Sequence, residues 1–173
     1  MLWSVLGTAI GGVLLSGCTP AQYPMIAGWL DDDGTPMVLA KPCGDDKVKG
    51  MYLLGSERTE SATSDSSKGA DADDPAAFTT WDANADPHRG GAFEFPLFAP
   101  PSAWRVSKDG SQRLKPGYEY DLMFYGGRGV FRSYNGIGGF STEDLKGLKP
   151  GQVWAADRAM SRKEFDDAVA DAC

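Results

Sequence analysis

Residues 118–125 of the chain read Tyr118-Glu119-Tyr120-Asp121-Leu122-Met123-Phe124-Tyr125. Large apolar side chains stand at positions 118, 120, 122 and 124, and this spacing of two is typical of a strand with one buried face. It is the clearest strand signal in the chain. A turn at Gly126-Gly127 and a partner strand over residues 129–134 are expected to follow it. The pattern therefore favours an antiparallel β-fold.

The entry into this strand resembles part of a known fold. Leu114-Lys115-Pro116-Gly117-Tyr118-Glu119-Tyr120 is similar to the corner before strand F in fibronectin-III-like and other immunoglobulin-like sandwiches. In that family a Tyr hydroxyl bonds back to the upstream backbone, and the resemblance assigns this role to Tyr120. It implies a β-sandwich, whereas a plain β-turn in another antiparallel fold is the alternative. Leu148-Lys149-Pro150-Gly151 is expected to be a second turn that leads into a strand.

Other segments are typical of short strands joined by turns. Residues 27–50 predict a strand, a turn at 31–36, a second strand, and a turn at 43–46, since both turns are rich in Asp and Gly. Further strands are expected over 48–54, from Phe78, over 93–98 and from Trp104. Pro96 indicates that the third of these is an edge or bulged strand.

A helix is expected over residues 162–172. Ser161-Arg162-Lys163-Glu164 is a capping box, in which Ser161 caps the helix and Glu164 reaches back. The apolar residues that follow recur at helical spacing and form one face that would lie on a sheet. They are Phe165, Ala168, Val169 and Ala172.

Composition supports one small domain. The 173 residues include 22 Gly and 11 Pro, which favours short elements and turns over a helical bundle. Residues 56–77 contain no aromatic residue and no Val, Leu or Ile, so they predict a mobile acidic loop. The expected fold class is mainly β: a small antiparallel, sandwich-like domain over residues 25–173 with a C-terminal α-helix.

The N-terminal segment resembles a bacterial lipoprotein signal. Residues 1–17 are largely apolar and uncharged, and they lead into Leu15-Ser16-Gly17-Cys18. This tetrapeptide is similar to the lipobox: an aliphatic residue, two small residues and a Cys. The resemblance implies that residues 1–17 are a signal peptide and that Cys18 becomes the first residue, carrying acyl chains such as palmitate. Signal peptides normally open with Lys or Arg. Here either the free amino group suffices or the start lies upstream of Met1.

Lipidation at Cys18 would decide where the protein resides. The formal net charge of −7 disfavours nucleic acid as a partner and gives no attraction to anionic head groups. The lipid anchor would therefore hold the protein on the extracytoplasmic face of the cell membrane, with residues 18–24 as a short tether. A retained transmembrane anchor and a cytosolic protein are the alternatives.

Export also bears on the two remaining cysteines. With Cys18 lipidated, Cys43 and Cys173 would meet an oxidising compartment, which predicts one disulfide. This bond would tie the C-terminal segment to an early strand. Two free thiols are the alternative. No metal site is expected from the cysteines and the single His, because their spacing is not that of zinc ligands.

No pattern predicts a catalytic site, a bound metal or a cofactor. His88 lies in an expected loop, and the chain has no Gly-x-Ser-x-Gly motif. Residues 82–86 alternate as in a calcium loop, but Pro87 stands where such a loop needs Gly, so a turn held by Asx side chains is favoured. The Gly-rich segments 126–129 and 136–139 are expected to be hairpin turns and not phosphate-binding loops.

Four tryptophans lie after the leader, at positions 29, 81, 104 and 154. They are expected to fill the core, and the alternative is an exposed row that stacks on sugar rings or a peptide. The sequence thus predicts a non-enzymatic binding or interaction module whose partner is an unknown envelope protein or glycan. A cell-envelope hydrolase would need clustered acids or His88 beside a nucleophile. A phage-type exclusion or inhibitor lipoprotein would show an apolar patch outside the core.

Overall fold

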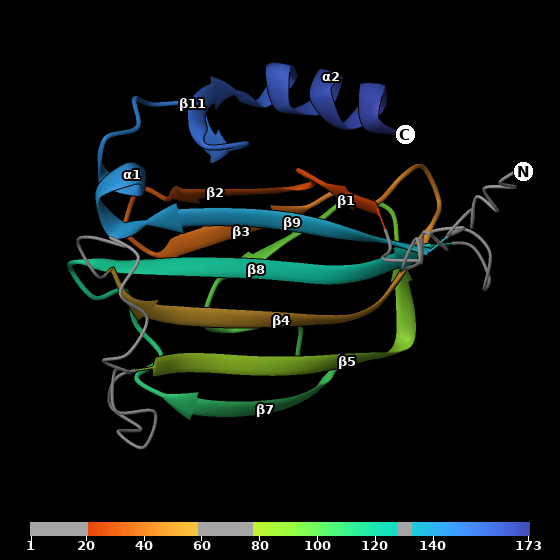
Figure 1. The fold of residues 1–173 in the computed structure, drawn as a ribbon, viewed down its shortest axis with the longest axis horizontal. Helices are drawn as coiled ribbons and strands as arrows, with labels where there is room; N and C mark the ends of the chain where they lie inside the picture. Colours follow the sequence, from red (N-terminus) through yellow and green to blue (C-terminus); the bar gives the residue numbers. More distant parts are fainter. Residues whose placement is uncertain (1–20, 59–77, 128–132) are drawn as a thin grey trace, which may run out of the picture.

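A computed structural model of the protein describes residues 21–58, 78–127 and 133–173, apart from the side chains of residues 86–89. Two β-sheets face each other (Figure 1). The six-stranded sheet has the order β1 (Ala21–Tyr23), β9 (Ser133–Ser141), β8 (Tyr118–Gly127), β4 (Lys47–Glu57), β5 (Phe78–Gly90) and β7 (Arg105–Gly110). The five-stranded sheet has the order β11 (Arg158–Ser161), β10 (Gln152–Ala155), β2 (Ile26–Leu30), β3 (Pro36–Ala40) and β6 (Phe93–Pro96).

All neighbouring strands are antiparallel except β1, which runs parallel to β9. The helices are α1 (Thr142–Lys146) and α2 (Arg162–Ala172). The structure therefore confirms the expected fold class of a mainly β, sandwich-like domain with a C-terminal helix. None of the helices among the described residues combines the length and the apolar character needed to cross a bilayer.

The core lies between the sheets and confirms the alternation read from the sequence. Tyr120, Leu122 and Phe124 of β8 are buried, so the residues between them face outward. Trp81 of the same sheet is buried opposite β6, where its ring meets Phe95 edge to face at 6.2 Å. Pro96 ends β6 at the edge of its sheet, as expected.

The corner before β8 has the hydrogen bonds that its sequence suggests. The Tyr120 hydroxyl accepts a hydrogen bond from the Lys115 backbone N–H at 2.6 Å and donates one to the Arg113 carbonyl at 3.2 Å. Gly117 has φ +74° and Gly151 has φ +81°, so both Leu-Lys-Pro-Gly segments turn through a conformation that favours Gly. Membership of the immunoglobulin-like superfamily stays a prediction.

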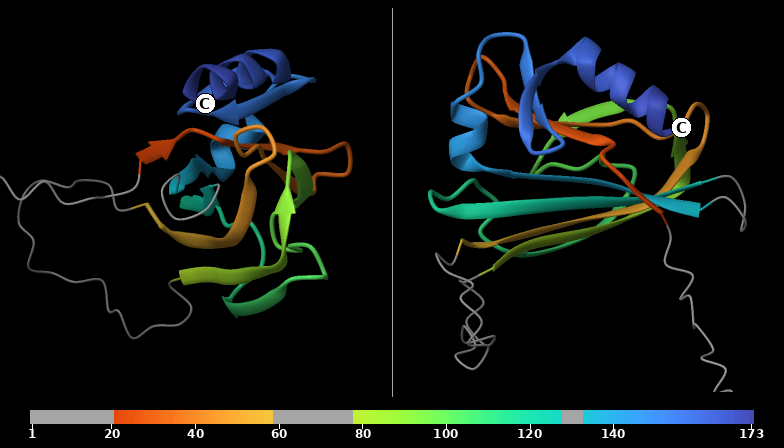
Figure 2. Two further views of the ribbon diagram at one scale, coloured as in Figure 1. Left: turned by 90° about the vertical axis from the view of Figure 1, so that its right-hand side faces the viewer. Right: turned by 45° about the horizontal axis from the view of Figure 1, so that its top comes forward.

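Helix α2 has the expected bounds. Ser161 and Glu164 form the capping box, and Phe165 and Val169 are buried on the helix face that packs against β10 and β11 (Figure 2). The helix is followed by Cys173, whose sulfur lies at disulfide distance from that of Cys43, with Cα atoms 5.4 Å apart. The C-terminus is thereby tied to the turn before β4.

The glycine-rich segments predicted as turns are strand residues wherever the structure describes them. Gly126 and Gly127 belong to β8 and pair with Tyr134 and Ser133 of β9, while residues 128–132, which hold most of the expected partner strand 129–134, lie outside the described residues. Residues 136–139 lie in the middle of β9. A Cβ atom at Gly136 would lie 2.1 Å from the Phe124 ring. Glycine serves close packing in this strand, and the expectation of hairpin turns was wrong for the described residues 126–127 and 136–139.

Three other boundaries differ from the sequence predictions. Residues 21–23 form β1, so part of the expected tether 18–24 belongs to the sheet and the ordered domain starts before residue 25. Residues 56–57 end β4, and 59–77 of the expected acidic loop lie outside the described residues. Residues 82–90, expected as turn and loop around His88, belong to β5, because Trp81, Ala83 and Ala85 are buried at a spacing of two that the polar residues between them obscure.

Candidate functional site

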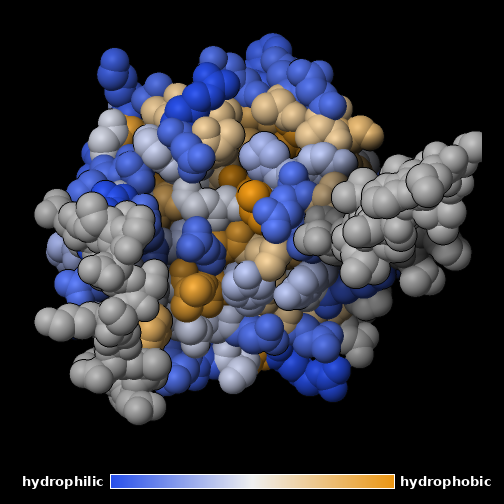
Figure 3. Space-filling model, in the orientation of Figure 1, coloured by the Kyte–Doolittle hydropathy of each residue, from blue (hydrophilic) through white to orange (hydrophobic). Residues whose placement is uncertain are grey.

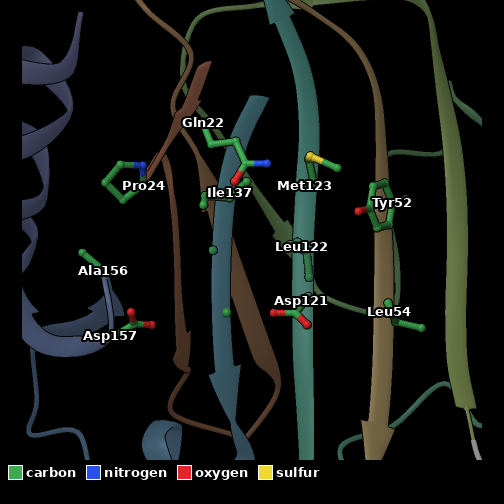
Figure 4. Close-up of a pocket in the computed structure, with 12 residues that line it drawn as sticks. Gln22, Pro24, Tyr52, Leu54, Asp121, Leu122, Met123, Ile137, Ala156 and Asp157 are labelled. Atoms are coloured by element: carbon green, nitrogen blue, oxygen red, sulfur yellow. The ribbon is translucent and has the colours of Figure 1, made fainter. Parts of the chain in front are cut away.

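A groove crosses the outer face of the six-stranded sheet, between this face and the hairpin that joins β10 to β11. Its volume is about 410 Å³. The lining residues come from β1, β4, β8, β9 and the hairpin (Figure 4). They are Gln22, Pro24, Tyr52, Leu54, Asp121, Leu122, Met123, Ile137, Gly138, Gly139, Ala156 and Asp157.

Strand register sets the floor of the groove as two cross-strand rows. The first row joins Tyr52, Met123 and Ile137. The second row joins Leu54, Asp121 and Gly139. Side chains two residues apart on a strand share one face and lie about 7 Å apart. The floor therefore presents an apolar row beside a row that carries a carboxylate.

One wall of the groove is made by the chain around β1 and by the β10–β11 hairpin. Gln22 and Pro24 line the groove beside Ile137. Figure 4 shows Asp157 and Asp121 on opposite sides of β9. Gly139 between them matters because a Cβ atom there would lie 2.9 Å from Asp121 Oδ1. Glycine on β9 thus leaves the space over which Asp121 extends.

The hairpin turn that carries Asp157 has an unusual backbone. Ala156 has φ +48° and Asp157 has φ +58°, the left-handed conformation that a two-residue type I′ hairpin requires. Asn and Gly normally occupy these positions, and a residue with a Cβ atom costs roughly 1–2 kcal/mol there. The turn therefore directs the Asp157 carboxylate to the groove at a cost in conformational energy.

Apolar side chains gather on this face of the molecule. Leu54 is 39% exposed and Tyr125 is 45% exposed, and they are the large hydrophobic residues that stand out as exposed among the described residues. The Tyr125 ring lies 6.4 Å from that of Tyr52. Figure 3 shows several apolar patches on this face of the molecule, with hydrophilic residues between and around them. Exposed apolar patches with a polar rim are typical of interaction surfaces.

The charge of the groove is negative. Asp121 and Asp157 line it, and no Lys or Arg is among its lining residues in the described chain. Partial burial, with the nearby carboxylates of Glu119 and Asp157, raises the pKa of Asp121. Burial, with Tyr125 and Asp121 close by, also raises the pKa of Tyr52. Removal from water and like-charge repulsion both disfavour the ionised form of these groups.

A second depression adjoins the groove and shares Asp121, Gly139 and Asp157 with it. It adds Glu119, Asp144, Trp154, Phe140 and Arg58. The Arg58 guanidinium is paired with the Glu119 carboxylate at 3.0 Å. Asp144 accepts hydrogen bonds from the Ser141 backbone N–H and hydroxyl at the start of α1, so its carboxylate completes the capping box of that helix.

Another depression lies where α1, the β2–β3 turn and the start of α2 meet. Its lining includes Trp29, Lys146 and Arg162. The Arg162 guanidinium stacks on the Trp29 ring at 4.3 Å and pairs with Glu94, so both groups already have partners within the protein. We therefore take the groove on the six-stranded sheet as the candidate site.

The residues singled out from the sequence lie away from this groove or outside the described chain. Cys18 is outside the described residues, and the sulfurs of Cys43 and Cys173 lie at bonding distance. His88 is on β5, and nothing is described of its side chain. Trp81 and Trp104 are in the core, while Trp29 and Trp154 are partly buried.

Acidic residues do not gather as metal ligands in the described chain. No group of three or more His, Cys, Asp or Glu side chains there is placed to hold a metal ion. Residues 82 and 84, part of the calcium-like pattern, are exposed positions on β5. The sequence alone did not predict the groove, because its two rows depend on how β4, β8 and β9 pair. The alternation of residues along β8 does indicate that Asp121, Met123 and Tyr125 face outward.

Comparison with known protein families, with curated proteins and with solved structures finds no match to this chain. The functional inference therefore rests on the residues of the chain and on the geometry of the groove.

Proposed function

We propose that the protein is an exported, lipid-anchored binding module of a bacterial envelope, and that it holds its partner on the outer face of the six-stranded sheet. The binding is non-enzymatic. The lipobox at Leu15-Ser16-Gly17-Cys18 supports the anchor and the extracytoplasmic location. The partner is an envelope component, and the anchor gives the protein its contact with the membrane.

The observation that carries the binding role is the apolar groove. Leu54 and Tyr125 are exposed on a face whose opposite side already forms a complete core, so the fold does not need these side chains outside. Exposing them costs roughly 25 cal/mol for each Å² of apolar surface that a partner would bury. An exposed apolar surface beside a groove supports an interaction role.

The anchor would keep this groove near the membrane. Cys18 is three residues before Ala21, where β1 starts, and three residues span at most about 11 Å. Gln22 of β1 lines the groove. A partner held there would thus lie close to the outer surface of the bilayer.

The same patch favours one special case of this function. An exclusion or inhibitor lipoprotein is expected to present a contiguous apolar or aromatic surface outside its core, and the row of Tyr52, Met123 and Ile137 beside Leu54 has this character. Such a protein would bind a membrane or envelope protein and block it. It remains a binding module with the same face.

Cysteine labelling tests the binding role. The proposed mature protein has no free thiol, because Cys18 is lipidated and Cys43 pairs with Cys173. A Leu54→Cys variant therefore introduces a single reactive site in the groove, and Ser102→Cys provides an exposed control in a loop. We expect maleimide to label Leu54→Cys at least threefold more slowly in intact cells than in the purified protein, with equal rates for Ser102→Cys. Equal rates for both variants would contradict a partner on this face.

Fractionation tests the anchor separately. A Cys18→Ser variant expressed behind a signal peptide that is cleaved without lipidation should leave the envelope fraction and appear in the soluble fraction, because no helix among the described residues has the length and apolar character to span a membrane. Retention of this variant in the envelope to the same extent as the parent protein would contradict lipid anchoring.

A further inference from the structure

The groove has a charge that no group of the described chain neutralises. The groove and the depression next to it are lined by four carboxylates and one guanidinium, and the guanidinium, Arg58, is already paired with Glu119. Asp144 completes the capping box of α1. Asp121 and Asp157 remain, and neither forms an ion pair or hydrogen bond with another described residue.

These two carboxylates lie in a setting where a bound cation would be favoured. The pKa of Asp121 is raised by partial burial and by the charges of Glu119 and Asp157. A positive group placed between Asp121 and Asp157 would offset this repulsion. The partly buried Trp154 ring lines the same depression and is a further group to which cations are attracted.

The apolar row lies at a fixed distance from the carboxylate row. Asp121 and Met123 are two residues apart on β8, which places their side chains about 7 Å apart on one face. Side chains at positions i and i+2 of an extended peptide have the same separation and the same direction. In an extended peptide that runs along β8 in either direction, the side chain at position i would therefore lie over one row and the side chain at i+2 over the other.

We propose that the groove binds an extended polypeptide segment in which a Lys or Arg is separated by one residue from a large aliphatic side chain. The cation lies between Asp121 and Asp157, and the aliphatic side chain contacts the row of Tyr52, Met123 and Ile137. This inference rests on the proposed function and names its partner class. The occupant is a polypeptide segment of another envelope protein. The negative charge of the groove and the spacing of its two rows favour this occupant.

Peptide titration of the full-length protein in detergent solution tests the proposal. The probe is an acetylated, amidated peptide with the sequence Gly-Thr-Arg-Thr-Leu-Thr-Gly. Its first control replaces Arg by the neutral citrulline, and its second places Arg and Leu in adjacent positions, so that their side chains point to opposite sides. We expect each control to bind at least fivefold more weakly than the probe, and probe affinity to fall as salt is raised.

Matched protein variants locate the site. The double variant Asp121→Asn with Asp157→Asn should bind the probe at least tenfold more weakly than the parent protein. Asp171→Asn, an exposed change on α2, should bind it unchanged. Melting temperatures measured on all variants separate lost binding from lost folding.

Each of the following results would overturn the proposal. Equal binding of the citrulline peptide would exclude recognition of the cation. Equal binding by the double variant would exclude this groove. Equally tight binding of hexylamine would identify a small cationic amphiphile as the ligand in place of a polypeptide. If the probe fails to bind while Leu54→Cys is protected in cells, the proposal of a cationic peptide is wrong, whereas the proposal that this face binds a partner is supported. If Leu54→Cys is also unprotected, the proposed function fails as well.

Discussion

Removing the Tyr120 hydroxyl tests how the corner before β8 holds the fold. The Tyr120 side chain is buried, and its hydroxyl joins two backbone groups, the N–H of Lys115 at 2.6 Å and the carbonyl of Arg113 at 3.2 Å. Tyr120→Phe keeps the ring and removes both hydrogen bonds. Each bond contributes about 1 kcal/mol, and a buried N–H left without a partner adds a further cost. We expect a loss of about 2–3 kcal/mol in the free energy of unfolding.

Urea unfolding followed by tryptophan fluorescence measures this loss. The midpoint should fall with an unchanged slope, and the melting temperature should fall by about 5–10 °C, since 1 kcal/mol shifts a domain of this size by about 2–4 °C. Tyr125→Phe is the control, because this ring is 45% exposed and should change stability by less than about 0.5 kcal/mol. If Tyr120→Phe behaves like Tyr125→Phe, the hydroxyl does not anchor the corner.

Three further predictions concern stability. Replacing both Cys43 and Cys173 by Ser should lower the free energy of unfolding by about 4–5 kcal/mol, because a bond between residues 130 positions apart restricts the unfolded chain. An unchanged urea midpoint would contradict this prediction. Ala156→Gly should raise stability by about 0.5–1 kcal/mol, because relief of the left-handed conformation exceeds the entropy that Gly adds to the unfolded chain; calorimetry showing a lower melting temperature would refute it. Burial raises the pKa of Tyr120 and Tyr134, so the folded state holds these protons more tightly than the unfolded chain. The stability that these two groups contribute is fully present below pH 10, the ordinary pKa of Tyr, and is lost as the pH rises through their raised pKa in the folded protein. Urea midpoints that stay constant from pH 9 to pH 11 would contradict this prediction.

Local signals predicted the parts of the fold that local chemistry determines. The spacing of two in 118–125 identified the buried face of β8, and the capping box at Ser161 and Glu164 placed α2 with its observed bounds. Turn residues at 31–36 separated β2 from β3. In each case neighbouring residues in the sequence supply the caps, turns or alternation, so the structure follows without knowledge of distant contacts.

The misplaced segments depend on contacts between distant residues. The glycines of segment 136–139 have a low propensity for strands, yet they lie in β9. Glycine is needed there because Phe124 and Ile26 occupy the space that Cβ atoms at Gly136 and Gly138 would take. Strand β1 is only three residues long and is held by its pairing with β9. Helix α1 was missed although Ser141 and Asp144 form a capping box, because five residues give too little periodicity to detect.

The candidate site shows the same division. The alternation of residues along β8 is enough to place Asp121, Met123 and Tyr125 on the outer face of the sheet. Their neighbours across the sheet, and the approach of Asp157 from the other sheet, follow from strand register and from the path of the β10–β11 hairpin. A groove built from five segments of the chain has no signature in any one of them.

The central claim is that the protein acts outside the cytoplasm, held by a lipid on Cys18. Mass spectrometry of the protein purified from its native host tests this most directly. We expect a chain that begins at Cys18, carries a diacylglyceryl group and has lost two hydrogens at Cys43 and Cys173. A chain that still contains residues 1–17 and has no acyl group would contradict the claim.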